Sequence, residues 1–496
     1  MNLMYQSTRD GQQRVTASQA ILQGLSPDGG LYVPEAIPVL TKTIEELSTM
    51  DYRELAYEVL KLFLTDYTED ELKDCIAKAY DEKFDTSEIA PLRNTGSACY
   101  LELFHGATIA FKDMALSILP HLLTKAAKKN KVQEEIVILT ATSGDTGKAA
   151  LAGFADVAGT GIIVFYPKDG VSSVQEKQMV TQRGRNTTVV GIRGNFDDAQ
   201  TGVKRMFHNK ELAAALKAAG YMFSSANSIN IGRLVPQIVY YVYAYATLYK
   251  KKQITEGEKI NFVVPTGNFG NILAAYYAKK MGLPINQLIC ASNENKVLFD
   301  FFSTGVYDKN RAFILTTSPS MDILVSSNLE RLIYHVADND PVKTAQLMSA
   351  LSTQGVYEIT DRMRSNLKDF IGGYATASET EEAIRKEYQE SGYVIDPHTA
   401  VATSVYHRYA EATGDHTKSV IVSTASPFKF AESVLSAIGE QEIPEDEYEQ
   451  AKLLSQVSGI VIPKAVEELQ GAEILHDKVC DTEDMQDIVE KVLKII

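Results

Sequence analysis

Residues 136–147 have the sequence IVILTATSGDTG, in which an apolar run passes directly into a cluster of small polar residues. A short, nearly continuous apolar run is typical of a strand buried on both faces of a parallel sheet. In open α/β sheets ligands bind beyond the carboxyl ends of the strands, where backbone N–H groups and helix N-termini face an anion. We therefore predict a buried strand at 136–140 and a ligand-binding loop at 140–147.

Two more loops of similar composition follow apolar runs further along the chain. The run 262–264 leads into PTGNFGN at 265–271, and the run 420–423 leads into STASP at 423–427. Each loop alone is also compatible with a glycine-rich turn before a helix cap, but the three together favour one shared site. The first loop matches neither GxxxxGK[ST] nor GxGxxG, so a compact phosphate group suits it better than a nucleotide or dinucleotide.

The central part of the chain alternates between apolar runs and amphipathic stretches. Further runs lie at 162–166, 187–192 and 287–290, and a long amphipathic stretch covers 196–219. This alternation predicts an open α/β sheet with helices on both sides. We assign residues 93–435 to this two-lobed central domain.

The N-terminal residues have a different periodicity. Leu55, Val59, Leu60 and Phe63 recur at helical spacing, and no chemistry-bearing cluster accompanies them. We therefore predict a helical N-terminal domain at 1–92.

The C-terminal segment, residues 436–496, is acidic. Residues 440–496 carry 15 Asp+Glu and 5 Lys, a net charge of −10 out of −15 for the whole chain. An apolar set lies on one face of a predicted helix and comprises Met485, Ile488, Val489, Val492 and Ile496. The segment is therefore expected to be folded and docked on the body of the protein.

Composition excludes several classes of protein. The 496 residues are 45% hydrophobic and 23% charged, the profile of an ordinary globular protein. The acidic balance argues against a nucleic-acid or anionic-membrane partner, since both require clustered cations. Four scattered cysteines, Cys75, Cys99, Cys290 and Cys480, indicate neither a disulfide framework nor a metal site.

The sequence shows no targeting or membrane-spanning segment. Residues 1–10 lack the apolar run of a signal peptide. The longest apolar and aromatic stretch, 238–249, has 12 residues, too few to span a bilayer as a helix. It reads as a buried helix that begins near Pro236 and ends at 250–252. We therefore expect a cytoplasmic protein.

One lysine stands out by its surroundings. Lys112 ends the stretch FHGATIAFK at 104–112, and a helix is predicted at 114–128 with a possible kink at Pro120. Most lysines are solvated, and we expect this of Lys148 and Lys168. A lysine near apolar groups has a lowered pKa and can form a Schiff base with an aldehyde cofactor. Together with a phosphate-binding loop, Lys112 points to pyridoxal 5'-phosphate.

With these residues in view, the chain resembles the threonine synthase family, whose members use pyridoxal phosphate. The resemblance covers nearly the whole chain, and its motifs are DGGLYVP at 28–34, LFHG at 103–106, AFKD at 110–113, TATSGDTG at 140–147, SANSIN at 225–230 with Arg233, GNFGN at 267–271, SMD at 320–322 and DPH at 396–398. The lysine segment and SANSIN are specific to this family, whereas the glycine loops are shared more widely. Ala107 departs from the family, which is expected to have proline there. His105 and His398 are expected either to be packed histidines or to support residues that contact the ligands.

The resemblance implies a tryptophan synthase β-like fold (fold type II), with two open, mostly parallel sheets flanked by helices and an added helical N-terminal domain. Lys112 would be the catalytic lysine that binds the cofactor and moves protons. Thr424 would meet the pyridine nitrogen, and the cofactor phosphate would lie on Gly267, Asn268, Phe269, Gly270 and Asn271. The substrate would contact Thr142, Ser143, Asp145, Thr146, Ser228, Arg233 and Asn271. No metal is implied.

The implied reaction converts O-phospho-L-homoserine and water to L-threonine and phosphate in a monomer or homodimer. One alternative is another enzyme of the same fold, such as a threonine or serine dehydratase or a cysteine synthase. The other alternative is a threonine-synthase-like protein that binds pyridoxal phosphate without turnover.

Overall fold

The computed structural model describes residues 2–96, 98–142, 144–171 and 173–495, and two mostly parallel sheets organise it. The first sheet has six strands in the order β13-β10-β9-β14-β4-β3. Its strands are β3 (Leu92–Asn94), β4 (Cys99–Glu102), β9 (Ile260–Pro265), β10 (Ile285–Ser292), β13 (Phe370–Tyr374) and β14 (Ser419–Ser423). All neighbours are parallel except β3 and β4.

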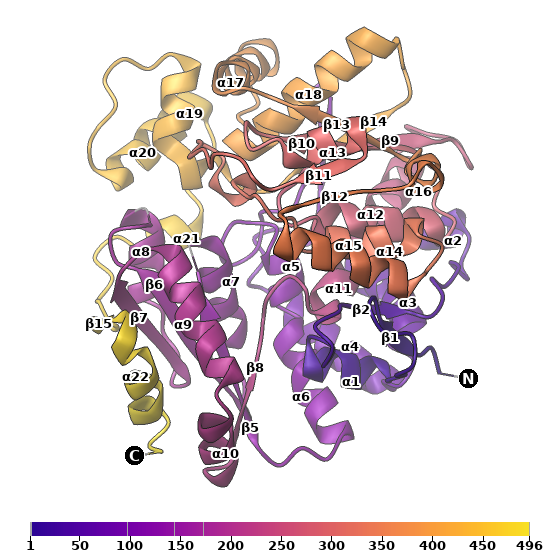
Figure 1. Ribbon diagram of the computed structural model, residues 1–496. Coiled ribbons are helices and arrows are strands. Elements are labelled where there is room, and N and C mark those ends of the chain that lie inside the picture. Colours follow the sequence, from indigo (N-terminus) through magenta and orange to yellow (C-terminus); the bar gives the residue numbers. More distant parts are fainter. Residues whose placement is uncertain (1, 97, 143, 172, 496) are drawn as a thin grey trace.

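The second sheet has five strands in the order β15-β7-β6-β5-β8, and every neighbouring pair is parallel. Its strands are β5 (Glu135–Ala141), β6 (Thr160–Pro167), β7 (Thr187–Arg193), β8 (Tyr221–Ser224) and β15 (Val479–Asp481). The predicted α/β fold with two open, mostly parallel sheets is therefore confirmed, and each of the six predicted apolar runs lies within a strand. Helices cover both sheets (Figure 1).

The N-terminal part is helical, as predicted. Its helices are α1 (Ala17–Gln23), α2 (Ile44–Ser48), α3 (Tyr52–Phe63) and α4 (Glu69–Ala79), and a short antiparallel pair, β1 (Tyr5–Ser7) and β2 (Tyr32–Pro34), accompanies them. Thr43, Asp51 and Thr68 each begin a helix with a capping box. Leu55, Val59, Leu60 and Phe63 of α3 are fully buried.

The remaining helices connect and cover the strands of the two sheets. They are α5 (Asp113–Leu116), α6 (Leu119–Lys129), α7 (Asp145–Phe154), α8 (Ser173–Val180), α9 (Phe196–His208), α10 (Lys210–Ala218), α11 (Ile231–Lys250), α12 (Gly270–Lys280), α13 (Val297–Thr304), α14 (Leu329–Val336), α15 (Pro341–Thr353), α16 (Asp361–Asn366), α17 (Ala377–Ser391), α18 (Pro397–Thr413), α19 (Ala431–Ile438), α20 (Glu447–Ser458), α21 (Lys464–Glu467) and α22 (Met485–Val492). Short 3₁₀ turns are η1 (Pro319–Met321), η2 (Pro427–Phe430) and η3 (Thr482–Asp484), and β11 (Val306–Asp308) pairs with β12 (Val356–Glu358).

The buried apolar helix starts earlier than predicted. Helix α11 begins at Ile231 and contains Pro236 in its interior, so the expected start near Pro236 is wrong. Asn230 caps the helix by accepting a hydrogen bond from the Gly232 N–H at 2.8 Å. Arg233 therefore lies in the first turn of a helix that packs against α2, α3, α5 and α12.

Two predicted helices are interrupted. The stretch 196–219 divides into α9 and α10 at Asn209, whose side chain caps α10. The helix expected at 114–128 divides into α5 and α6, and Pro120 is the second residue of α6 rather than the site of a kink. Proline is tolerated in a first turn because its missing N–H has no partner there.

The end of the acidic C-terminal segment is docked on the second sheet, whereas Leu454 of α20 packs in the core cluster of the first sheet. Strand β15 pairs with β7, and α22 lies beside α9, as Figure 1 shows at the lower left. Met485 and Val489 are fully buried, and an added Cβ at Gly202 of α9 would lie 2.4 Å from Met485 Sδ. Ile496 lies outside the described residues.

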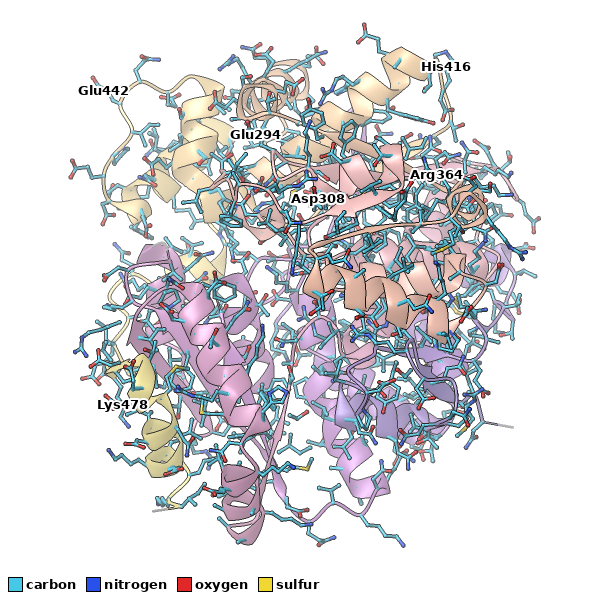
Figure 2. All side chains as sticks on the ribbon, in the orientation of Figure 1. Glu294, Asp308, Arg364, His416, Glu442 and Lys478 are labelled. Atoms are coloured by element: carbon cyan, nitrogen blue, oxygen red, sulfur yellow. The ribbon has the colours of Figure 1, made fainter. Side chains whose placement is uncertain are left out.

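Charged side chains lie mainly on the outside of the molecule. Figure 2 labels examples on widely separated elements, among them Arg364, His416, Glu442 and Lys478. Among the described residues, no helix has the length and apolar character needed to cross a membrane. All four cysteines are free and buried.

We predict that Met485→Ala destabilises the protein because it leaves a cavity between α22 and α9. The free energy of unfolding should fall by about 2–4 kcal/mol, the usual loss for a buried large-to-small substitution. Urea denaturation monitored by circular dichroism measures it. Val461→Ala is the control, because Val461 is 80% exposed and its truncation should change stability by less than about 0.5 kcal/mol. Equal effects of the two substitutions would contradict a packed tail.

His105 links strand β4 to the N-terminal part through two carboxylates. Its Nδ1 is 2.6 Å from Asp85 Oδ1 and its Nε2 is 2.9 Å from Glu102 Oε2. Burial alone lowers the pKa of His105, but the hydrogen bonds to Asp85 and Glu102 outweigh it and raise the pKa to about 9. Both ring nitrogens therefore donate, and the side chain is packed as expected.

The raised pKa of His105 predicts a pH-dependent contribution to stability. The contribution is fully present below the unfolded pKa of about 6.5 and is lost as pH rises through about 9. His105→Gln should therefore destabilise the protein by about 2 kcal/mol more at pH 7 than at pH 10, a value reduced because Asp85 is 59% exposed. Denaturant unfolding of wild type and variant at the two pH values measures it.

His121→Gln serves as the control for this pH dependence. Burial lowers the pKa of His121 to about 4, so this side chain is neutral in the folded and unfolded states between pH 7 and pH 10. Its effect on stability should be the same at both pH values. A His105→Gln effect that is equally constant would contradict the doubly bonded, charged state of His105.

Candidate active site

The three predicted ligand loops and the Lys112 loop lie at the carboxyl ends of strands. Strands β9, β14 and β4 are neighbours in the first sheet, so the loops that follow them meet at one edge. The Phe111 N–H donates to the Thr424 carbonyl at 2.8 Å, and the Ser426 N–H donates to the Ile109 carbonyl at 3.0 Å. These bonds fix the Lys112 loop beside the loop that carries Thr424.

The Lys112 loop is held from within by a buried carboxylate. Asp113 accepts the Thr108 N–H at 2.8 Å and the Thr108 hydroxyl at 2.6 Å. An added Cβ at Gly106 would lie 2.6 Å from Asp113 Cβ, so only glycine fits there. Asp113 therefore has a structural role and fixes the backbone from which Lys112 projects.

Lys112 projects toward the other sheet. Its Nζ lies 3.4 Å from Asp145 Oδ2 and 3.1 Å from Ser320 Oγ, and 12% of its side chain is exposed. Burial lowers the pKa of Lys112, an effect that Asp145 opposes and that the charges of Lys429 and Arg233 strengthen. A lysine with a lowered pKa supplies the uncharged amine that reacts with a carbonyl carbon.

Asp145 is the first residue of α7, which follows β5 in the second sheet. One of its oxygens is 2.7 Å from Lys429 Nζ, and the other faces Lys112 and accepts the Ser320 hydroxyl at 3.3 Å. Burial alone raises the pKa of Asp145, but Lys429 and Lys112 outweigh it and hold the pKa well below its usual range. The second sheet thus contributes a charged carboxylate to the lysine of the first.

The GNFGN loop forms a tight turn into α12. Phe269 has a left-handed backbone (φ 64°), and Gly270 begins the helix. Because an added Cβ at Gly267 would lie 2.5 Å from the Ser320 carbonyl oxygen, this position requires glycine. In the part of the chain that the structure describes, no side chain of the N-cap residue Phe269 caps α12, and the first-turn N–H groups of this helix suit a phosphate.

Two buried donors at the site have no hydrogen-bond partner among the described residues, namely Asn271 Nδ2 and Arg233 Nε. Tyr240 and Tyr241 both donate to Asn271 Oδ1, at 2.6 and 2.5 Å, which leaves the amide nitrogen for another acceptor. Burial lowers the pKa of Arg233 to about 10. Unsatisfied buried donors are costly, so an anion of the phosphate type fits this site.

The remaining predicted site residues lie on the same loops. Thr142 Oγ1 accepts the Gly144 and Gly147 N–H groups and shapes its own loop. Thr146 lies in the first turn of α7, and Ser228 precedes α11. Thr424 is buried, whereas Asn268 is exposed and its carbonyl accepts the Asn328 N–H at 3.1 Å. Ser143 lies outside the described residues.

The sequence motifs gave no role to Ser320 or Lys429. The Ser320 N–H donates to His398 Nε2 at 3.2 Å, so His398 carries its proton on Nδ1, 2.7 Å from Asp396 Oδ2. This buried pair holds Ser320 against Lys112, in agreement with the expected packed histidine. Ser320 and His398 lie in quoted motifs, whereas Lys429 has no signal beyond its closeness to Thr424 in sequence.

The two lysines expected to be solvated, Lys148 and Lys168, differ in their exposure to solvent. Lys168 is 44% exposed and pairs with Glu176, as expected. Lys148 Nζ donates to Gln182 Oε1 at 2.7 Å, and burial lowers its pKa to about 8, so the prediction is wrong for Lys148. The packing of α8 against α7 causes the difference.

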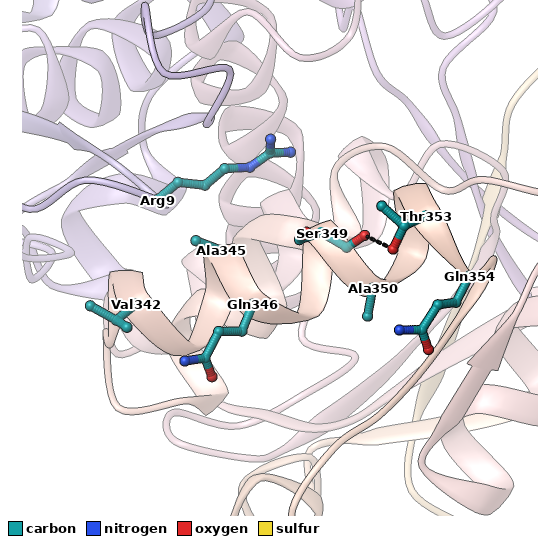
Figure 3. A pocket seen from close by; sticks show the side chains of 8 residues that line it. All are labelled: Arg9, Val342, Ala345, Gln346, Ser349, Ala350, Thr353 and Gln354. Carbon is teal, nitrogen blue, oxygen red and sulfur yellow. Dashed lines mark hydrogen bonds between the residues drawn. The ribbon is translucent and has the colours of Figure 1, made fainter.

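A shallow surface groove of about 540 Å³ lies apart from these loops, between Arg9 and helix α15 (Figure 3). Arg9 already makes two bonds to Glu330, at 2.7 and 2.8 Å. None of the predicted site residues lines the groove.

Three sequence families match the chain. "Threonine synthase N terminus" matches residues 4–80, "Pyridoxal-phosphate dependent enzyme" matches 90–425, and "Threonine synthase, C-terminal" matches 399–488.

Individual relatives agree with these matches. Threonine synthase-like 1 of Pongo abelii is 38% identical to this chain, and the match covers 98% of this chain and 67% of that protein. Threonine synthase of Schizosaccharomyces pombe is 37% identical, and the match covers 88% of this chain and 89% of that protein. The crystal structure of threonine synthase from Brucella melitensis with bound pyridoxal phosphate superposes with a TM-score of 0.87, at 34% identity and over 99% of both chains. The chain therefore belongs to the threonine synthase family of pyridoxal-phosphate-dependent enzymes.

Proposed function

We propose that the protein is a threonine synthase, a lyase that converts O-phospho-L-homoserine and water to L-threonine and phosphate in threonine biosynthesis. The observation that carries the proposal is the buried amine of Lys112 in a site that also contains Arg233 Nε and Asn271 Nδ2, two donors without a partner among the described residues. A lysine that binds the cofactor explains the first feature. Two phosphate groups, one on the cofactor and one on the substrate, explain the second.

The residues divide between cofactor and substrate. Pyridoxal phosphate supplies an electron-withdrawing ring that acidifies the carbon-bound protons of an amino acid attached to it. Gly267, Gly270 and Asn271 would hold its phosphate at the N-terminus of α12, and the Thr424 hydroxyl would hydrogen-bond its ring nitrogen. Lys112 carries protons between the substrate carbons, and its lowered pKa favours the uncharged amine that this role requires.

Arg233 binds the substrate phosphate, assisted by Ser228, and retains it after it leaves the carbon chain. A guanidinium suits this role because it bonds phosphate oxygens in pairs. Arg233 lies in the first turn of α11, so the partial positive charge of this helix N-terminus also attracts the phosphate. The loop 142–147 holds the amino-acid end of the substrate, with Asp145 facing Lys112.

The domain division remains part of this proposal. A helical N-terminal domain at 1–92, a two-lobed catalytic domain at 93–435 and a C-terminal segment at 436–496 place the reacting groups in the central part. We propose that the enzyme acts in the cytoplasm as a monomer or homodimer.

A second candidate follows from relatives that are named threonine synthase-like rather than threonine synthase. In that case the chain binds pyridoxal phosphate without turning over phosphohomoserine. The Lys112 amine, the free donors and the intact GNFGN loop favour the enzyme. Dehydratases and cysteine synthases of the same fold need no phosphate-binding arginine, so turnover of threonine or O-acetylserine in place of phosphohomoserine would identify them.

We predict that the purified protein releases phosphate from O-phospho-L-homoserine and that Lys112→Ala lowers kcat by at least about 10³-fold, because the proton carrier is removed. A continuous phosphate assay measures both. Lys148→Ala is the matched control, because burial also lowers the pKa of Lys148, yet its Nζ bonds Gln182 rather than a reacting group. Cofactor binding without phosphate release by the wild type would favour the second candidate.

We predict that Arg233→Gln raises the KM for phosphohomoserine about 10- to 100-fold, since a hydrogen bond to a charged group contributes about 1.5–3 kcal/mol. It should also raise the fraction of 2-oxobutanoate, because phosphate is no longer retained beside the reacting carbon. Steady-state kinetics and product analysis measure the two effects.

Arg311→Gln is the control for the loss of a partly buried arginine. Arg311 donates to the Asp308 carbonyl at 2.8 Å and to Asp300 Oδ2 at 2.6 Å, neither of which is a predicted site residue, so its loss should reduce stability and leave KM unchanged. Full threonine output by Arg233→Gln at an unchanged KM would exclude Arg233 from the phosphate site.

A further inference from the structure

Lys429 is a buried lysine in the site that has no assigned role. It lies on η2, which follows Thr424, and only 1% of its side chain is exposed. Its Nζ is 2.7 Å from Asp145 Oδ1 and donates to the Thr108 carbonyl at 3.2 Å. Because a buried ammonium requires a charged partner and hydrogen bonds, these two contacts fix the position of Lys429.

The contacts of Lys429 join three parts of the site. Asp145 begins α7 on the second sheet, Thr108 lies in the loop that ends at Lys112, and Lys429 itself follows β14 of the first sheet. The Asp145 carboxylate thus lies between the side-chain nitrogens of two lysines, with Lys429 Nζ at 2.7 Å from one oxygen and Lys112 Nζ at 3.4 Å from the other.

We propose that Lys429 is a positioning residue of the catalytic centre, which holds the charged Asp145 carboxylate across the two sheets so that its second oxygen faces Lys112. Once Lys112 is attached to the cofactor, Lys429 is the ammonium that continues to neutralise Asp145. Its role in turnover rests on the proposed function, whereas its effect on the charge state of Lys112 does not.

The surrounding charges decide the direction of the effect. Lys112 faces Asp145, Lys429 and Arg233, and Asp145 faces His398 in addition to the two lysines. Asp113 and Lys148 also lie near Lys429. Removal of the Lys429 charge ends its repulsion of Lys112 and its attraction to Asp145, so the pKa values of both groups rise.

Turnover requires Lys112 as an uncharged base and Asp145 as a carboxylate. A higher pKa of either group therefore displaces the acidic limb of the plot of kcat/KM against pH toward higher pH. In the cofactor-loaded enzyme, Lys429→Gln should move this limb up by about one pH unit or more and lower kcat/KM at least about tenfold on its acidic side. The pH titration of the cofactor's absorption band should move in the same direction.

Two further variants separate charge from packing. Lys429→Arg keeps the charge, so its acidic limb should stay within about 0.3 pH unit of wild type even where kcat falls. Lys279→Gln is the matched control, because Lys279 Nζ also pairs with a carboxylate, Asp369 Oδ1 at 2.8 Å, and donates to a carbonyl, Asn286 O at 2.7 Å. The Lys279→Gln variant should be less stable than wild type, but the acidic limb of its kcat/KM profile should stay at the same pH.

An acidic limb and an absorption titration of Lys429→Gln that coincide with wild type would overturn the proposal. So would a displacement in Lys429→Arg as large as in the neutral variant. Where Lys429→Gln does not fold, Lys429→Met provides a neutral side chain of similar volume for the same measurements. If the wild type releases no phosphate, the proposed function fails, but the absorption titration still tests the link between Lys429 and Lys112.

Discussion

The burial of the Lys112 amine between the two sheets is the constraint on which the rest of the site depends. An amine removed from water loses its proton more readily, and the free amine is the form that attacks a carbonyl carbon or accepts a proton. The same burial is unfavourable for a charged lysine unless a nearby anion neutralises its charge. Asp145 supplies that compensation, so the two sheets must meet where β4 and β5 end.

The strand order satisfies this requirement with little freedom. Since β9, β14 and β4 are parallel neighbours, the GNFGN loop, Thr424 and Lys112 emerge side by side from one edge. Helix α11 then crosses the molecule and brings Arg233 and the two tyrosines that bond Asn271 to the same region. Ser320 approaches Gly267 closely and bonds Lys112, so it joins the GNFGN loop to the lysine.

Much of this fold could be predicted because its determinants are local. The strands are apolar runs buried on both faces, and the site loops follow them directly in sequence. Contacts between distant segments could not be predicted. Helix α11 begins at the cap that Asn230 provides and not at Pro236, where the sequence predicted its start. The burial of Lys148 depends on its bond to Gln182, which lies in the segment after α8. Lys429 meets Asp145 only when both sheets are in place.

The net charge of the whole chain does not reveal the charge of the site. The protein is acidic overall, with a net charge of −15, yet Lys112, Lys429 and Arg233 lie buried near one another with Asp145 between the two lysines. Gathering cations away from water is unfavourable unless anions neutralise them. The proposed cofactor and substrate both carry phosphate and would supply those anions. The surplus of buried positive charge would then couple the stability of the site to the binding of these ligands.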